Sequence, residues 1–385
     1  MSRRVRETAR FVWLNIGIAL LVLFLMESAA RGVFALRDRA RTAAARTEFE
    51  RHVPFYVGTE EEWVRGLLRE QREARQGEWH PYVYWRARPY QGTYLNINKE
   101  GIRRTWNSTA SLSPGQLKVF TFGGSTMWGA GARDDFTIPS LVSKTLSKRV
   151  RAGVWVVNLS ESGYVSTQEV IALILELQKG NGPDLAVFYD GVNDTFAAFQ
   201  SRVAGIPQNE HNRVAEFDAL KRFGVRQAIV EKLALYRLIG GGMRSRGIPR
   251  TDGLPNDQLA RAVVNVYLRN ISIVEGLAQR FGFRAVFFWQ PTVFTKKQLS
   301  PWERQVYQES ERRLGAASFY GEVYEAFKER MKTSPADNVH DLSGIFDDVR
   351  DTIFSDEFHV SEAGNQKIAE SIAGTLQKVT KERTK

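Results

Sequence analysis

A serine on a glycine hinge is the first chemically suggestive feature of this sequence. The run KVFTFGGSTMWGAG, residues 118–131, is apolar up to Gly123 and Gly124 and then presents Ser125. Glycine lets another group approach the backbone closely, and open α/β sheets bind ligands at the carboxyl ends of their strands. Ser125 is therefore either a nucleophile or an ordinary turn serine, because Gly-Ser turns are common.

Other polar residues follow further apolar runs. Gly163 comes after VWVVNL, Asn193 comes after DLAVFYD, and Asp356 and His359 precede the last helical stretch. If the apolar runs are parallel strands, their carboxyl ends share one edge of a sheet. We therefore expect these residues to converge on Ser125.

This set of residues is what acyl transfer needs. A serine hydroxyl becomes a good nucleophile when an imidazole takes its proton, and a carboxylate holds that imidazole in the right tautomer. We predict Ser125 as nucleophile, His359 as general base and Asp356 as the residue that orients His359 Nδ1. The backbone N–H groups of Ser125 and Gly163 and the side-chain amide of Asn193 are predicted to form the oxyanion hole.

Each of these residues also has a purely structural interpretation. Asn193 lies in GVND, which is good turn chemistry, and glycine at 163 has many uses. Asp194 is expected to support its loop rather than the chemistry. His340 and the carboxylates of HDLSGIFDD, residues 340–348, are rivals, but none of them lies at the start of the last helical stretch as Asp356 and His359 do.

Strands alternate with helices from residue 117 onward. Four nearly continuous apolar runs predict parallel strands covered on both faces: LKVFTF, VWVVNL, DLAVFYD and RAVFFWQ. Helical patterns lie between and after them, at residues 138–150, 166–178, 257–281, 300–332 and 361–379. This alternation predicts an α/β fold, a doubly wound three-layer α/β/α sandwich with a parallel central sheet.

Three further segments fit around this domain. Residues 37–51 are rich in alanine and mixed charge, which indicates a solvated stalk helix. Thr59 and Glu62 have the spacing of a capping box and predict a short amphipathic helix, and residues 80–106 predict a small β accessory layer. The segment 195–256 is inserted between the third and fourth strands, where it is either a lid or a helical excursion packed on the domain.

The N-terminus has the pattern of a membrane anchor. Arg3, Arg4, Arg6 and Arg10 precede an uncharged run at residues 11–26. As a helix, that run is about 24 Å long, which is shorter than a bilayer core of about 30 Å. Continuing the helix to residue 36 makes it long enough. The charges in this extension can be tolerated because Glu27 can pair with Arg31 one turn later. The arginines favour a cytoplasmic N-terminus, so we predict a single-pass protein of the cell (inner) membrane with a periplasmic or other extracytoplasmic catalytic domain. The alternatives are a cleaved signal peptide ending at SAA, residues 28–30, and a buried core helix, which would not explain the arginine cluster.

Composition limits the remaining functions. The chain has no cysteine, and its five histidines form no HxH or HxxxH pair, so we expect no metal and no cofactor. The net charge of +11 raises the question of nucleic acid, but no basic tract interleaved with aromatics follows the N-terminus. We therefore expect no nucleic-acid partner.

Four blocks in order, GGST, the glycine of NLSESG, GVND and DEFH, resemble the SGNH/GDSL hydrolase superfamily over residues 117–379. Gly124 replaces the aspartate of the usual GDS. The resemblance implies a flavodoxin-like fold, a triad of Ser125, Asp356 and His359, and oxyanion donors from Ser125, Gly163 and Asn193. These are the same residues as those chosen above on chemical grounds.

The expected organisation is therefore an anchor at 1–36, a stalk and accessory region at 37–110, and a hydrolase domain at 111–385. The expected activity is that of a serine esterase that removes O-acyl, above all O-acetyl, groups from a cell-envelope carbohydrate or another ester. An O-acyltransferase with the same triad, supplied by a membrane acyl-donor protein, is the first alternative. A catalytically inactive envelope scaffold or glycan-binding protein is the second.

Overall fold

The computed structural model describes residues 3–52, 61–74, 77–210, 213, 216 and 254–381. The chain divides into two units, residues 1–52 with 211–251, and residues 53–210 with 252–385. Most of the inserted segment 195–256 lies outside the described residues, as does Thr59 of the predicted capping box. The expectations for those positions stay predictions.

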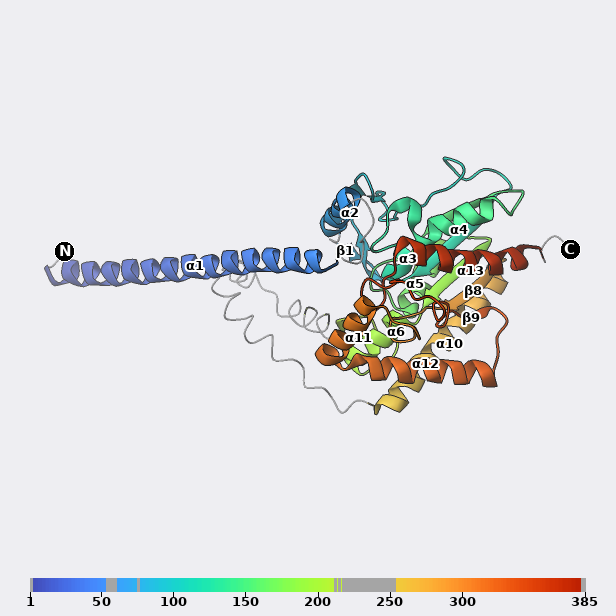
Figure 1. Cartoon of the computed structure of the whole chain (residues 1–385). Helices are drawn as coiled ribbons and strands as arrows, with labels where there is room; N and C mark the ends of the chain where they lie inside the picture. Colours follow the sequence, from blue (N-terminus) through green and yellow to red (C-terminus); the bar gives the residue numbers. More distant parts are fainter. Residues whose placement is uncertain are drawn as a thin grey trace. The chain divides into compact units, whose positions relative to one another are not determined.

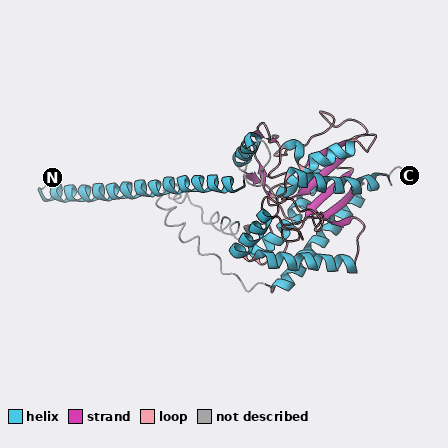
Figure 2. Cartoon of the chain, in the orientation of Figure 1, coloured by secondary structure: helices cyan, strands magenta, loops and turns pink. Residues whose placement is uncertain are grey.

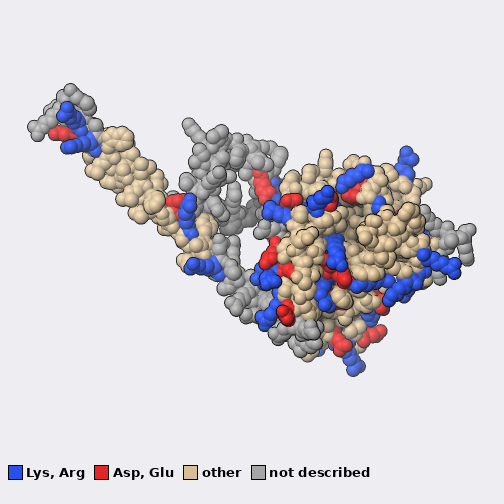
Figure 3. All heavy atoms as spheres, turned by 90° about the horizontal axis from the view of Figure 1, so that it is seen from above, with Lys and Arg blue, Asp and Glu red and all other residues tan. Residues whose placement is uncertain are grey.

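The first unit contains one long helix, α1 (Arg3–His52). Its segment Arg6–Arg37 is long and apolar enough to cross a membrane. Figure 3 shows the apolar stretch of this helix as an uninterrupted tan band between charged ends. Glu27 and Arg31 form the predicted ion pair at 3.0 Å, so the charges that follow the apolar run are paired within the helix.

The second unit is built on a five-stranded sheet in the order β6-β5-β7-β8-β9 (Figures 1 and 2). Every neighbouring pair is parallel. In chain order this arrangement is 2-1-3-4-5, the flavodoxin-like doubly wound topology, which confirms the predicted fold class. The strands are β5 (Leu117–Gly123), β6 (Val154–Asn158), β7 (Leu185–Asp190), β8 (Arg284–Trp289) and β9 (Val339–Asp341).

Both faces of the sheet are buried, which explains why its strands read as continuous apolar runs. Phe122, Phe188 and Phe287 stack across neighbouring strands on one face, with ring centroids 4.8 and 5.0 Å apart. Val119 and Val187 point into the core on the opposite face. The short strand β9 was not predicted, because three residues without an apolar run carry no strand pattern.

Helices cover each face of the sheet (Figure 2). The core on the Phe122 face includes α5 (Ser166–Gln178), α10 (Asn256–Phe281) and α12 (Ala316–Thr333), and the core on the Val119 face includes α4 (Ile138–Ser147) and α13 (Glu362–Lys381). The prediction of a single helix over residues 300–332 was wrong. Gly315 adopts a left-handed φ of 62° and separates α11 (Pro301–Leu314) from α12, and glycine takes that conformation at little cost.

A small accessory layer precedes the sheet, as predicted. It contains α2 (Glu61–Ala74), the antiparallel pair β1 (Gly77–His80) and β2 (Tyr84–Ala87), and the antiparallel pair β3 (Tyr90–Gln91) and β4 (Asn96–Ile97). The buried carboxylate of Glu70 accepts the backbone N–H groups of Thr93, Tyr94 and Leu95. Helix α2 thereby fixes the turn between β3 and β4.

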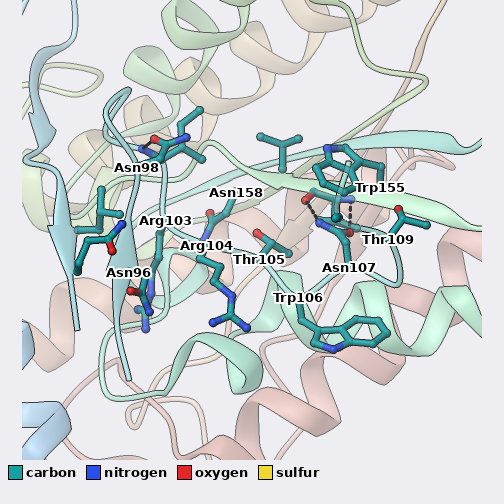
Figure 4. A pocket seen from close by; sticks show the side chains of 16 residues that line it. Asn96, Asn98, Arg103, Arg104, Thr105, Trp106, Asn107, Thr109, Trp155 and Asn158 are labelled. Carbon is teal, nitrogen blue, oxygen red and sulfur yellow. Dashed lines mark hydrogen bonds between the residues drawn. The ribbon is translucent and has the colours of Figure 1, made fainter. Parts of the chain in front are cut away.

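The edge strand β6 is capped by the segment that follows the accessory layer. The side-chain amide of Asn107 donates to the carbonyl of Val156 at 3.0 Å and accepts its N–H at 2.8 Å, as a neighbouring strand would (Figure 4). Arg103 forms an antiparallel bridge with Asn158. An exposed sheet edge invites pairing with other chains, and these contacts occupy it.

Arg103 joins this segment to the residues that follow Ser125. Its side chain is fully buried and pairs with Asp134 at 3.0 Å. The guanidinium also donates to the carbonyls of Trp128, Gly129 and Ala132. These carbonyls lie at and just after the end of the short helix α3 (Ser125–Trp128), so Arg103 fixes the geometry of the segment that begins with Ser125.

Replacing Arg103 by methionine should lower the free energy of unfolding by about 3–5 kcal/mol, because it leaves the carboxylate of Asp134 buried without its partner. The neighbouring Arg104 is the matched control, since its side chain is 54% exposed and pairs with the exposed Asp135. Arg104→Met should change stability by no more than about 1 kcal/mol. Denaturant unfolding of the full chain in detergent micelles measures both values, and equal losses would contradict this role for Arg103.

Candidate active site

The candidate site lies where the sheet changes its direction of winding. Strands β5 and β7 are neighbours, but β6 lies on one side of them and β8 on the other. The crevice at the carboxyl ends of such a strand pair is where doubly wound folds bind ligands. Ser125 directly follows β5, and Asn193 follows β7 at the start of α6 (Val192–Ser201).

An unbroken chain of hydrogen bonds joins three of the predicted residues. His359 Nε2 lies 2.7 Å from Ser125 Oγ, although the two residues are 234 positions apart in the sequence. His359 Nδ1 lies 2.6 Å from Asp356 Oδ2. Serine, imidazole and carboxylate are therefore in hydrogen-bonding order.

The loop between β9 and α13 turns back on itself to make this arrangement. Asp356 Oδ1 accepts the backbone N–H groups of Phe358 at 2.9 Å and His359 at 2.8 Å, which leaves Oδ2 for the imidazole. Ser355 N–H donates to the carbonyl of His359 at 2.8 Å and closes the turn. The DxxH spacing thus places the carboxylate against its own histidine.

A buried ion pair anchors the same loop to the domain. Glu303 in the first turn of α11 pairs with Lys296 at 2.6 Å, and both side chains are fully buried. Glu303 Oε1 also accepts the backbone N–H groups of Ile353 and Phe354, while Lys296 Nζ donates to the carbonyl of Asp351. The sequence carried a signal for this anchor, because Ser300 and Glu303 have capping-box spacing.

Asp356 is ionised at any ordinary pH. Burial raises the pKa of its carboxyl, but the positive charge and hydrogen bond of His359 and two backbone N–H groups outweigh that effect and lower the pKa to about 2. A carboxylate that stays negative favours the Nδ1–H tautomer of the neighbouring imidazole and stabilises its protonated form. His359 Nε2 is then available to accept the hydroxyl proton of Ser125.

Asn193 lies directly against the glycine that precedes the serine. A Cβ placed on Gly124 would be 1.9 Å from Asn193 Nδ2. The amide donates one N–H to the carbonyl of Tyr164 at 2.7 Å, and its oxygen accepts from Gln208 Nε2 at 3.2 Å. These contacts fix which way the amide faces, and they explain why residue 124 has no side chain.

Gly163 completes this side of the site. It adopts a left-handed φ of 81°, a conformation that glycine takes readily. A Cβ at this position would lie 3.5 Å from the Trp85 ring and 3.8 Å from the Gln208 amide. Gln208 therefore lies near Gly163 while bonding to Asn193, and it brings the second and third predicted blocks together.

The buried carboxyl groups behind this loop support it. Asp194 accepts both the N–H and the hydroxyl of Ser166, in keeping with the expected supporting role. Burial raises the pKa of Asp194. Burial, reinforced by the neighbouring carboxyl of Asp190, also raises the pKa of Glu169.

The rival residues of the sequence analysis have other partners. His340 stacks on Phe288 with ring centroids 5.2 Å apart. Asp341 accepts the N–H of Ser343, and Asp347 pairs with Lys297. Within the described part of the chain, no group of three or more histidine, aspartate or glutamate residues could hold a metal ion.

Two residues beside the site were missed from the sequence. Gln208 lies in the inserted segment, and Trp85 lies in β2 of the accessory layer. Trp85 Nε1 donates to the carbonyl of Ser162 at 2.9 Å, next to Gly163. Neither position carries a local motif, because its relation to the site depends on contacts with distant parts of the chain.

No protein-family model matches this chain, and no curated protein is found to be similar to it. Solved structures similar to the chain include GDSL lipolytic proteins and esterases. One is an acetyl xylan esterase, 14% identical, which covers 66% of this chain and 98% of its own with a TM-score of 0.35. Another is a member of the lipolytic G-D-S-L family from Veillonella parvula, 11% identical, for which the match covers 66% of this chain and 94% of that chain with a TM-score of 0.35. A third is a lipase/acylhydrolase from Enterococcus faecalis, 12% identical, for which the match covers 68% of this chain and 96% of that chain with a TM-score of 0.36.

Gly124→Ala should lower the free energy of unfolding by about 1–3 kcal/mol, because the added methyl group has to displace the Asn193 amide. Gly321→Ala in α12 is the matched control, since nothing lies within 4 Å of its Cβ position. That control should be stabilising by about 0.5–1 kcal/mol. Denaturant unfolding of both variants measures the difference, and a neutral Gly124→Ala would show that the amide moves freely.

Glu161 makes stability depend on pH near neutrality. Burial raises the pKa of its carboxyl to about 7 from 4.5, although the N–H groups of Ala87 and Ser162 oppose this. The folded protein then holds a proton that the unfolded chain releases, so this contribution is full below about pH 4.5 and is lost as the pH rises toward 7. The denaturant concentration at the midpoint of unfolding should fall less between pH 5 and pH 8 in Glu161→Gln than in the unsubstituted chain. Equal falls in the two proteins would contradict the raised pKa of Glu161.

Proposed function

We propose that this chain is a serine esterase that works through an acyl-enzyme on Ser125. The observation that carries the proposal is the continuous hydrogen-bond chain from Asp356 through His359 to Ser125. A hydroxyl bonded to an imidazole, which is in turn bonded to a carboxylate, is the arrangement that activates serine for attack on a carbonyl.

In the first half-reaction His359 Nε2 takes the proton of Ser125 Oγ as the oxygen attacks the ester carbonyl. The negative charge that develops on the carbonyl oxygen meets the backbone N–H groups of Ser125 and Gly163 and the Asn193 amide. The imidazolium then gives its proton to the leaving alcohol, and the acyl group stays on Ser125. Water then attacks this acyl-enzyme while His359 takes its proton, the bond between the acyl carbon and Ser125 Oγ breaks, the imidazolium returns the proton to Ser125, and the free acid leaves.

The hydrogen bonds of Asn193 support its role as an oxyanion donor. One of its N–H groups donates to the carbonyl of Tyr164, and Gln208 holds its oxygen. The second N–H is then presented from the face that lies against Gly124, one residue before the nucleophile. A donor fixed before the reaction costs no reorganisation when charge develops.

We further propose that the substrate is an O-acyl ester, in the first instance an O-acetyl group, on a carbohydrate of the cell envelope. The apolar segment of α1 supports this placement, because the arginines that precede it favour a cytoplasmic N-terminus and an exported catalytic unit. The anchor would then hold the enzyme near envelope polymers.

Ser125→Ala and His359→Ala should each lower kcat for p-nitrophenyl acetate by about 10⁴-fold or more, and Asn193→Ala should lower it by about 10²–10³-fold. Ser111→Ala and His340→Ala are matched controls away from the triad and should keep the activity. A fluorophosphonate probe should label the full chain in detergent micelles at Ser125 and should not label Ser125→Ala.

The products separate the alternatives. Release of free acetate from an O-acetylated oligosaccharide supports the esterase. Acetyl transfer to an added oligosaccharide in excess of acetate release would replace hydrolysis by O-acyl transfer with the same triad. No turnover and no labelling of Ser125 would refute the proposal and favour a catalytically inactive envelope protein.

A further inference from the structure

A strip of aromatic residues, half-buried at its inner end and exposed at its outer end, extends from the candidate active site along the hairpin β1–β2. Trp79 and Trp85 are directly opposite each other in the antiparallel ladder, so their side chains lie on the same face. The centroid of the Tyr84 ring lies 5.6 Å from that of Trp79 and 6.4 Å from that of Trp85. At its outer end, the Trp79 side chain is 63% exposed.

The inner end of this strip is in contact with the site. The Trp85 ring lies 3.5 Å from the position that a Cβ on Gly163 would occupy. It packs edge to face on Tyr164 with centroids 5.7 Å apart. The three aromatic residues therefore form one surface that begins at a proposed oxyanion donor.

The hairpin is held rigidly against the Gly163 loop. Gln168 Nε2 donates to the carbonyl of Val83, and the hydroxyl of Tyr164 donates to the carbonyl of Trp85. Glu161 Oε2 accepts the N–H of Ala87. Binding surfaces are more precise when a second set of contacts fixes them, and these contacts fix the strip relative to Ser125.

Polar acceptors border the aromatic surface. The hydroxyl of Tyr84 donates to Glu210 Oε1 at 3.3 Å, and Glu210 Oε2 is buried with no hydrogen-bond partner among the residues that the structure describes. Gln208 lies beside Gly163. A buried acceptor with no donor is costly, and a ligand rich in hydroxyl groups would satisfy it.

We propose that Trp79, Tyr84 and Trp85 form a glycan-binding subsite that orients the acylated sugar over Ser125. Sugar rings present C–H groups on their faces and hydroxyl groups at their edges. They match an aromatic strip that is bordered by carboxylate and amide groups. This inference rests on the proposed esterase function and adds the residues that would select a carbohydrate ester.

The charge beside the strip favours a glycan over a lipid surface. Trp and Tyr also gather at membrane interfaces, so an exposed tryptophan alone does not distinguish the two. Glu210 borders the strip through its hydrogen bond with Tyr84, whereas Glu78 on β1 is paired with Arg88 at 3.9 Å. The Glu210 carboxylate would repel an anionic headgroup at this position, and it would accept hydrogen bonds from sugar hydroxyls.

The test compares two substrates in the full chain in detergent micelles. The probes are an O-acetylated xylo-oligosaccharide and p-nitrophenyl acetate, which is too small to span the strip. In Trp79→Ala the ratio of kcat/KM for the oligosaccharide to kcat/KM for p-nitrophenyl acetate should fall about tenfold, which corresponds to about 1.4 kcal/mol, because the ring that contacts the sugar is removed. The fall should come mainly from a higher KM for the oligosaccharide. Trp79→Phe, which keeps an aromatic ring, should restore most of the ratio.

Phe281→Ala is the matched control. Phe281 is 55% exposed, but it precedes β8 and lies at the amino ends of the strands, whereas Ser125 lies at their carboxyl ends. The ratio of the two kcat/KM values should therefore stay unchanged in Phe281→Ala. Equal ratios in Trp79→Ala and the unsubstituted chain would overturn the subsite. Quenching of tryptophan fluorescence by brominated lipids in reconstituted vesicles, if lost in Trp79→Phe, would overturn it in favour of a lipid surface.

A binding measurement separates this inference from the function it rests on. Ser125→Ala should bind the acetylated xylo-oligosaccharide, and Ser125→Ala combined with Trp79→Ala should bind it about tenfold more weakly. Binding by the first variant when the unsubstituted chain hydrolyses neither substrate would refute the esterase and keep the subsite. Hydrolysis of p-nitrophenyl acetate without any Trp79-dependent binding would refute the subsite alone.

Discussion

Asp356 receives three hydrogen-bond donors from its own loop, and the rest of the site depends on this contact. Two backbone N–H groups and the His359 imidazole converge on one carboxylate. They hold its pKa at about 2 despite burial. A carboxylate that remains charged orients the imidazole, and the imidazole then reaches Ser125. Without this turn, the histidine and the serine would be two unrelated loop residues.

The remainder of the domain brings the other groups to that contact. The parallel sheet places the ends of β5 and β7 side by side, so Ser125 and Asn193 approach each other without any local signal between them. The buried ion pair of Lys296 and Glu303 anchors the loop that carries Asp356 and His359, because Glu303 accepts backbone N–H groups just before Asp356. Arg103 holds the carbonyls that follow α3. Each anchor is buried and fully bonded, which is the condition under which buried charges are tolerated.

The accessory layer has a functional place in this arrangement. Its hairpin lies on the Gly163 loop through hydrogen bonds in both directions, and it brings Trp85 to the proposed oxyanion donor. The sequence pattern of residues 80–106 indicated strands but gave no reason for them. In the structure the first two strands pack on the Gly163 loop, and in the proposed subsite they form a wall that the exposed Trp79 extends away from Ser125. The proposed preference for an acylated sugar follows from this wall and not from the triad, which serves any ester.

Local pattern determined much of this protein. Apolar runs bounded by glycine and aspartate predicted four of the five sheet strands. Helical periodicity predicted the longer helices of the domain apart from the break at Gly315, but it did not predict α3 or α6. Residue type and order selected Ser125, Asn193, Asp356 and His359, because acyl transfer admits few alternatives. An uncharged run after four arginines marked the segment of α1 that can cross a membrane. Tertiary structure alone decided which groups surround those residues. Gln208, Trp85 and Arg103 reach the site through contacts with distant parts of the chain, and such pairings leave no periodicity or spacing in the sequence because packing, not local geometry, creates them. Glu303 carries capping-box spacing with Ser300, but that spacing does not indicate the loop that Glu303 holds.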